Sequence, residues 1–230
     1  MSQMSAAEKT YWKEEEKRMK GILRTLRAAY THDCFKEKRP EACHNLADLW
    51  LGLDQEFKKA HDLYEKTCLE HKHAHSCFKY GKMRRTGGKD VPKDENAAIE
   101  ALRYACEEEC NSEACYEYSL AVALGSDDKY APDEKAAFNS LKKACALGHP
   151  VSCLQVARSY YSGSNGAPCQ DKYVAVEFAK QACSQFRWEG CKMVWKMHEQ
   201  GDGVDKNPEI ARRYRLLTRS LREQAGLPLD

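Results

Sequence analysis

Residues 105–115 read ACEEECNSEAC, and two of the cysteines, Cys106 and Cys115, lie nine residues apart. Pairs separated by eight or nine residues occur five times in the chain: Cys34/Cys43, Cys68/Cys77, Cys106/Cys115, Cys145/Cys153 and Cys183/Cys191. The second cysteine of each pair returns after 34 residues and then, three times, after 38 residues. A fixed period of this length indicates a repeat protein, in which similar units stack along the chain.

The stretches between the cysteine pairs read as helical hairpins. In one of them, apolar residues recur at three- and four-residue steps from Ala114 to Gly125 and again from Ala136 to Cys145, around a loop with Pro132. The expected fold class is therefore all-α, a right-handed α/α solenoid of helical hairpins. The expected divisions are an N-terminal capping helix in 1–39, with its helix over about 6–38; five repeats over 40–225, at about 40–75, 76–113, 114–151, 152–189 and 190–225; and a frayed tail at 226–230.

The position of the pairs on this map predicts disulfides. The first cysteine of a pair falls in the last turn of one hairpin, and the second falls in the first turn of the next hairpin. Antiparallel helices pack with axes about 8–10 Å apart, and facing cysteines there reach the Cα separation of about 4.4–6.8 Å that a disulfide needs. Two alternatives stay open: buried free thiols, and a metal array, although only Cys106/Cys110 approaches the spacing of zinc ligands.

The last hairpin is expected to lack the linking cysteine. The offset of 30 residues that takes Cys115 to Cys145 and Cys153 to Cys183 takes Cys191 to Leu221. A terminal repeat has no following repeat to be joined to, so this loss is typical of the end of an array.

Charge and hydropathy give no reason to expect a nucleic-acid ligand or a membrane span. The 230 residues carry 37 Lys and Arg against 35 Asp and Glu, a net charge of +2, which gives no reason to expect binding to nucleic acid. No stretch approaches the roughly 18 consecutive apolar residues of a membrane span. The sequence therefore predicts neither a nucleic-acid ligand nor a membrane span.

The cysteines and the N-terminal stretch together suggest a compartment. Twelve cysteines favour an oxidising environment. Residues 1–20, MSQMSAAEKTYWKEEEKRMK, have no apolar segment of a secretory signal, and Glu8 and Glu14–Glu16 are atypical of a matrix transit peptide. We expect the mitochondrial intermembrane space, with import coupled to cysteine oxidation by the disulfide relay.

The hairpins resemble Sel-like repeats, relatives of the tetratricopeptide repeat. The resemblance covers about residues 34–221 and is carried by glycines near the end of the first helices, by the turn Gly201-Asp-Gly-Val-Asp-Lys206, and by the segment 144–149, ACALGH. Cysteine pairs in this register are similar to those of the Hcp-type cysteine-rich proteins. The mitochondrial members of that group imply a protein-binding scaffold that assembles respiratory chain complexes, chiefly cytochrome c oxidase. The resemblance also implies haem binding and thiol–disulfide exchange as alternative activities.

Two cysteines and four histidines are the candidate residues for those activities. Cys110 is one helical turn after Cys106, where it could exchange with the Cys106–Cys115 bond if its thiolate were available, and Cys169 lies in a loop after Pro168. Imidazole is a frequent ligand for haem and for metals. The candidate ligands are therefore four histidines, His44, His71, His73 and His75. The alternative interpretation is an exposed polar linker at 71–75. The covalent haem signature Cys-x-x-Cys-His is absent, so a haem would bind non-covalently.

A secreted penicillin-binding or β-lactamase-like enzyme is the third hypothesis, because some Hcp-type proteins are described in that way. Ser140 and Lys143 match the Ser-x-x-Lys spacing, but no Lys-Thr-Gly follows. The sequence therefore favours a non-enzymatic, monomeric scaffold for protein clients. Tryptophans such as Trp50, Trp188 and Trp195 are expected to line its core and its binding surface.

Overall fold

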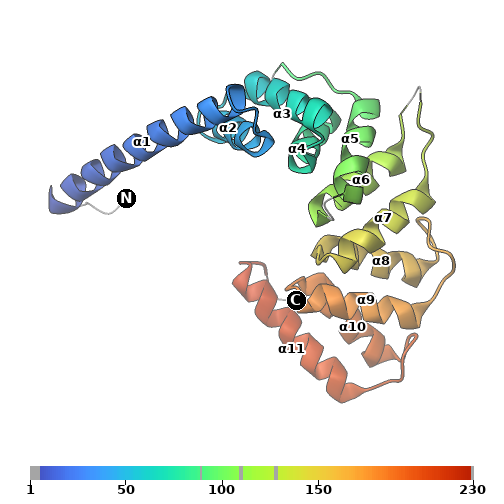
Figure 1. Ribbon diagram of the computed structural model, residues 1–230. Helices are drawn as coiled ribbons and strands as arrows, with labels where there is room; N and C mark the ends of the chain where they lie inside the picture. The colour runs from blue at the N-terminus through green and yellow to red at the C-terminus, as the bar shows by residue number, and fades with distance from the viewer. Residues whose placement is uncertain (1–5, 89, 109–110, 127–128, 229–230) are drawn as a thin grey trace. The chain divides into compact units, whose positions relative to one another are not determined.

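The computed structural model describes residues 6–88, 90–108, 111–126 and 129–228 (Figure 1). Apart from an isolated bridge between Gly88 and Val91, the regular structure in these ranges is helical. The helices are α1 (Ala6–Phe35), α2 (Pro40–Gly52), α3 (Phe57–His71), α4 (Ala74–Thr86), α5 (Glu95–Glu108), α6 (Ser112–Leu124), α7 (Glu134–Ala146), α8 (Pro150–Ser162), α9 (Lys172–Ser184), α10 (Trp188–Gln200) and α11 (Pro208–Gln224).

The chain divides into two compact units, and the boundary falls inside α4. The first unit contains Met1–Tyr80 and Gly87–Pro92, and the second contains Gly81–Thr86 and Lys93–Asp230. In the first unit α1 packs on α2 and α2 on α3; in the second unit each helix from α5 to α11 packs on the next. Neighbours in sequence are thus neighbours in space, as expected for stacked hairpins.

The first helix ends three residues earlier than the sequence predicts. A helix is expected over about 6–38, whereas α1 ends at Phe35. Lys38 adopts a left-handed backbone with φ of 56°, which a right-handed helix cannot contain. Arg39 then takes the extended conformation of an N-cap, and Pro40 occupies the first position of α2, where a missing N–H costs nothing.

The second helix of each later hairpin begins at an acid or amide side chain. The carboxylates of Asp133 and Asp171 accept the backbone N–H of Ala136 and Val174, at 2.8 and 3.0 Å. Asn207 does the same for Ile210 at 3.0 Å. Such caps satisfy N–H groups that have no partner within the helix, so they fix where each helix starts.

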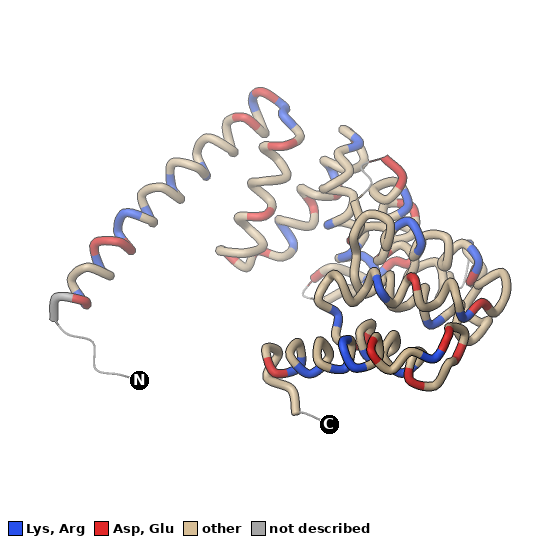
Figure 2. The backbone as a smooth tube through the Cα atoms, turned by 90° about the horizontal axis from the view of Figure 1, so that it is seen from below, with Lys and Arg blue, Asp and Glu red and all other residues tan. Residues whose placement is uncertain are grey.

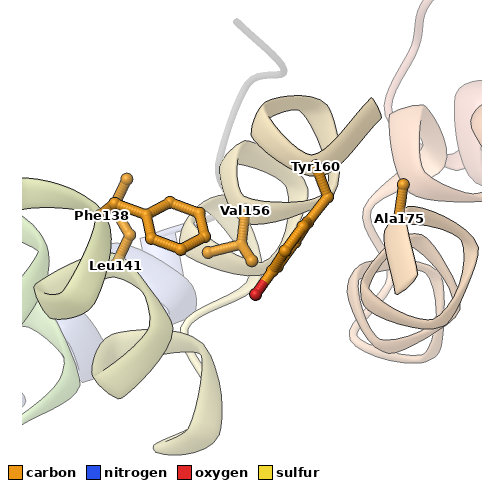
Figure 3. Packing of buried hydrophobic residues seen from close by; sticks show 5 residues of the cluster. All are labelled: Phe138, Leu141, Val156, Tyr160 and Ala175. Carbon is orange, nitrogen blue, oxygen red and sulfur yellow. The ribbon is translucent and has the colours of Figure 1, made fainter. Parts of the chain in front are cut away.

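Apolar side chains from three consecutive helices form the core of the second unit. The cluster contains Phe138 and Leu141 of α7, Val156 and Tyr160 of α8, and Ala175 of α9 (Figure 3). The rings of Phe138 and Tyr160 meet edge to face, with centroids 5.3 Å apart. The core is therefore continuous from one hairpin to the next.

The all-helical repeat fold predicted from the sequence is confirmed in the part of the chain that the structure describes, and its cysteine pairs lie at disulfide distance. Among the described helices, none combines the length and the apolar character needed to cross a membrane.

Candidate functional site

Five disulfides join the hairpins to one another and join α1 to the first hairpin. The bonds are Cys34–Cys43, Cys68–Cys77, Cys106–Cys115, Cys145–Cys153 and Cys183–Cys191, with Cα–Cα distances between 4.5 and 4.7 Å. The most exposed of these ten cysteines, Cys183, is only 8% exposed. A thiolate from solvent has little access to sulfur atoms buried in this way, so the geometry favours structural bonds over exchangeable ones.

Each disulfide coincides with the start of a helix. The second cysteine is always the fourth residue after the N-cap, and its N–H donates to the carbonyl of that N-cap. The five bonds measure between 2.9 and 3.3 Å, and their acceptors are Arg39, His73, Asn111, His149 and Arg187. The disulfide and the first helical hydrogen bond therefore fix the same turn.

A left-handed residue precedes the cap at four of the five joints. These residues are Lys38, Lys72, Gly148 and Phe186, with φ between 53° and 88°. At the remaining joint the equivalent residue is Cys110, which lies outside the described residues. The exchange predicted between Cys110 and the Cys106–Cys115 bond therefore stays a prediction. Cys169 lies in the loop between α8 and α9, where its side chain is exposed and forms no disulfide.

The structure brings together three of the four candidate histidines. The ring of His44, on α2, lies with its centroid 5.2 Å from that of His73 and 5.9 Å from that of His75. His71, the last residue of α3, is exposed and takes no part in these ring contacts. The sequence placed His71, His73 and His75 on a linker, but His75 lies within α4 and His73 immediately precedes that helix.

The position of His73 explains its role. Its Nδ1 accepts the backbone N–H of Ser76 at 3.3 Å and lies 2.9 Å from the Ser76 hydroxyl. Because that nitrogen already accepts, the hydroxyl donates to it and is left to accept from Nδ1 of His44, at 3.1 Å. His73 is thus the N-cap of α4. His149 caps α8 with the same contacts to Ser152, at 3.2 and 2.8 Å.

Burial keeps His44 neutral. Its pKa is lowered to about 4, chiefly because burial penalises the charged ring; Asp48 opposes that effect, and His73, His75 and Lys79 add to it. Asp48 also accepts a short hydrogen bond from the Tyr64 hydroxyl and pairs with Lys79 at 3.5 Å. Burial and this hydrogen bond raise the pKa of Tyr64.

These contacts do not fit a haem site. A haem needs a planar slot and an imidazole nitrogen directed at the iron. The three rings instead contact one another, Nδ1 of His44 and of His73 bind Ser76, and Nε2 of His44 lies 3.6 Å from Asp48. The arrangement supports a helix start rather than a cofactor.

A separate group on α3 has the composition of a metal site. Ligand atoms of His61, Asp62 and Glu65 lie within 4.8 Å of one another. Glu65 already accepts a hydrogen bond from Tyr80 at 2.9 Å, and Asp62 lies 3.0 Å from His61 and 3.9 Å from Lys58. The two carboxylates and Nδ1 of His61 thus already have partners, whereas Nε2 of His61 is buried without a hydrogen-bond partner among the described residues.

The Ser140 and Lys143 pair does not form a catalytic site. The Ser140 hydroxyl donates to the carbonyl of Ala136 at 2.9 Å and is 8% exposed, while the Lys143 amine reaches the carbonyl of Glu107 at 3.5 Å. A nucleophilic serine needs a base within reach of its hydroxyl, and this hydroxyl is committed to its own helix.

The sequence did not predict a basic groove that lies between α10 and α11. It encloses about 510 Å³ and is lined by Trp195, Leu216, Thr218 and six basic side chains: Lys192, Lys196, Arg212, Arg215, Arg219 and Arg222. The guanidinium of Arg215 lies 5.3 Å from the centre of the Trp195 ring. The net charge of +2 conceals this local excess, although the spacing of arginines between 212 and 222 was a usable signal.

Comparison with known proteins identifies the class. The Sel1 repeat family matches residues 40–70, 74–109, 112–149, 150–185 and 196–214, so that each of the first four matches covers one helical hairpin. The chain belongs to the Sel1 repeat family. Two solved structures share the fold: a Sel1 repeat protein from Oxalobacter formigenes (TM-score 0.71, 17% identity, 87% of this chain and 82% of that one) and c5321 of uropathogenic Escherichia coli (TM-score 0.68, 18% identity, 88% and 44%).

Among its curated relatives, the chain is similar to several that share one name, cytochrome c oxidase assembly factor 7. The relative from Xenopus tropicalis is 31% identical over 90% of both chains. The human relative is 28% identical over 84% of this chain and 85% of its own. A homologue from Drosophila melanogaster is 27% identical over 92% of this chain and 91% of its own.

Proposed function

We propose that this protein is an assembly factor for cytochrome c oxidase and that it acts as a protein-binding scaffold in the mitochondrial intermembrane space. The observation that carries the proposal is similarity along the whole length to relatives of that name, at 31% identity over 90% of both chains in one case. Stacked hairpins present extended surfaces to other proteins, which is how repeat proteins commonly work.

The disulfides support the compartment. Paired cysteines persist where the environment is oxidising and are rare in the cytosol and nucleus. Five buried pairs at equivalent joints are consistent with a chain that is oxidised as it enters the intermembrane space through the disulfide relay. We further propose that the protein is a monomer whose partners are protein clients.

The alternative is a thiol–disulfide oxidoreductase, and burial of the ten bridging cysteines disfavours it. An oxidoreductase needs a disulfide that an incoming thiolate can reach. The exposed cysteine, Cys169, has no described partner with which to form one.

Gene disruption with re-expression tests the proposal. Cells that lack the protein should lose assembled cytochrome c oxidase on native gels and should regain it with the wild-type chain. The protein should also become accessible to protease only when the mitochondrial outer membrane is ruptured. Normal oxidase levels in the disrupted cells would refute the assembly role, and protection after rupture would refute the compartment.

A further inference from the structure

The second helices of successive hairpins share three buried positions, and in α7 and α9 residues at these positions contact the next hairpin. Counted from the N-cap, these are the fifth, eighth and twelfth residues. They are apolar and buried in three consecutive repeats: Ile99, Leu102 and Cys106 after Asp94; Phe138, Leu141 and Cys145 after Asp133; Val176, Ala179 and Cys183 after Asp171. Phe138 and Leu141 pack on α8, and Ala179 packs on Val194 of α10. This stripe is therefore the surface that receives the first helix of the following repeat.

In α11 the same three positions are arginines. Its N-cap is Asn207, so the positions are Arg212, Arg215 and Arg219, and all three are exposed. Other positions keep their character, since Ala211 is buried like its equivalent Ala175. Counting from Cys191 pointed to Leu221 as the equivalent of the linking cysteine. The structure corrects this to Arg219, because the caps of the last hairpin, Arg187 and Asn207, are 20 residues apart, against 22 for His149 and Asp171.

The charged residues that line the groove around this arginine stripe are all basic. Lys192 and Lys196 face it from α10, and the helix that leads to the C-terminus shows its basic positions in Figure 2. Arg219 pairs with Glu223 at 3.1 Å, but no carboxylate among the described residues lies within 4.0 Å of Lys196, Arg212 or Arg215. These three basic side chains are therefore available to carboxylates of a partner.

We propose that the groove between α10 and α11 binds an acidic amphipathic helix of a partner protein, seated where the first helix of a further repeat would pack. The arginines occupy the positions that receive the following helix in other repeats, which makes this surface a helix-docking face. Its positive charge favours acidic residues on the side of the partner helix that meets the arginines. Trp195 and Leu216, the latter 60% exposed, offer apolar contact between the charges. The inference goes beyond the proposed function, because it depends only on the geometry and charge of these two helices.

The shape of the site favours a helix over a flat anionic surface. Trp195 lines the groove among the basic side chains of α10 and α11, so a ligand must enter the groove to reach its ring, which a planar bilayer does not do. A helix laid along the groove would contact Trp195 and the arginine stripe together. The partner is therefore expected to bind through its shape as well as through its charge.

Binding of a designed helix to the full-length oxidised protein tests the proposal. The probe is a fluorescent, chemically stapled peptide of 13 residues, the length of the first helices α6, α8 and α10, because unstapled helices of this length are marginal in water. Its glutamates lie on one face beside leucines. A second peptide has the same composition with the glutamates distributed around the helix. Fluorescence anisotropy should show that the first peptide binds and that the second binds at least about tenfold more weakly.

Charge-reversed variants locate the site. The variant R212E/R215E/R219E should weaken binding by at least about tenfold. The matched control K13E/K17E/R24E makes the same change in net charge on exposed positions of α1 and should alter affinity by less than about twofold. The conservative triple variant with lysine at 212, 215 and 219 should retain most of the binding, and melting curves verify that each variant is folded.

Each contrary outcome overturns the proposal. Equal binding of the two peptides would mean attraction by net charge without helix docking, and equal losses in the groove and control variants would place the site elsewhere. Vesicles that contain anionic phospholipid and a single-stranded oligonucleotide form the comparison arms. If either binds in a groove-dependent manner while the helix does not, the ligand is a membrane surface or a nucleic acid instead.

Discussion

Gly190, in the first turn of α10, lies at a point where two helices come as close as their backbones allow. A Cβ atom at this position would lie 2.7 Å from the carbonyl oxygen of Ala179, 2.8 Å from the Cβ of Ala182 and 2.9 Å from the nitrogen of Cys183. Two of these three atoms belong to the backbone, so the clash cannot be relieved by rotating a side chain.

The first prediction therefore compares two glycine-to-alanine changes. Gly190→Ala should destabilise the fold by about 1–3 kcal/mol, because overpacking outweighs the gain in helix propensity. Gly21→Ala, in α1, has no atom within 4 Å of the added Cβ and should be neutral or stabilising by up to about 1 kcal/mol. Urea denaturation measures both, and an unaffected Gly190→Ala would show that α9 and α10 are not packed this closely.

The second prediction concerns the pH dependence of stability. His44 has a pKa of about 4 in the folded protein, against an ordinary value of about 6.5 in the unfolded chain. The unfolded chain therefore binds a proton between these values while the folded protein does not, so stability is full above pH 6.5 and falls as the pH is lowered toward 4. The expected loss is about 2–3 kcal/mol.

Denaturation at a series of pH values, with His44→Gln as the control, tests this prediction. The variant should have a shallower dependence between pH 6.5 and 4. Part of the slope should remain, because burial also lowers the pKa of His149, with Glu113 and Glu117 opposing it. Superimposable profiles of the wild-type and variant proteins would contradict the prediction.

Residue types alone could not assign a role to these histidines. A sequence shows that His73 and His75 are close together and that imidazoles bind metals and haem. Whether His73 is a ligand or an N-cap depends on where α4 begins, and the three-residue spacing to Ser76 becomes informative only once that start is known. The contact of both with His44 joins residues 29 and more positions apart in the sequence, and no local pattern predicts it.

Among the helices and their connections, all five joints combine an N-cap and a disulfide within a few residues. At four of them a left-handed residue precedes the N-cap. The cysteine period predicted the number and the approximate place of the joints, because it is a property of the sequence itself. It did not predict the left-handed residues, since lysine and phenylalanine at 38, 72 and 186 are unusual there. It also placed the last link at Leu221, because a loop shorter by two residues cannot be recognised without the caps.

The third prediction concerns one joint. Cys145→Ala/Cys153→Ala removes a buried disulfide that closes a loop of eight residues, which should cost about 2–3 kcal/mol in free energy of unfolding. Cys169→Ala removes a cysteine that is exposed and unbridged, so its stability should match that of the wild-type protein. Thermal unfolding with and without reductant compares them. Equal melting temperatures in the two variants would show that the bridge does not stabilise the joint.

At the scale of the whole molecule, the sequence predicted the class of fold better than the surface. Hairpin order follows from local periodicity, so the all-helical repeat architecture was within reach. The basic groove could not be predicted in this way, because the total charge of +2 averages over acidic and basic segments. The arginines of α11 can be recognised as replacements of buried residues only when α11 is aligned with α5, α7 and α9.

The connectivity of the bridges has a consequence for how the protein is made. Every one of the five bridges closes a small ring of eight or nine residues, and no ring encloses or threads another. Correct pairing is therefore a local search at each joint. A reduced chain should regain its native bonds by simple oxidation, joint by joint and in any order, without an isomerase to unscramble distant mispairings.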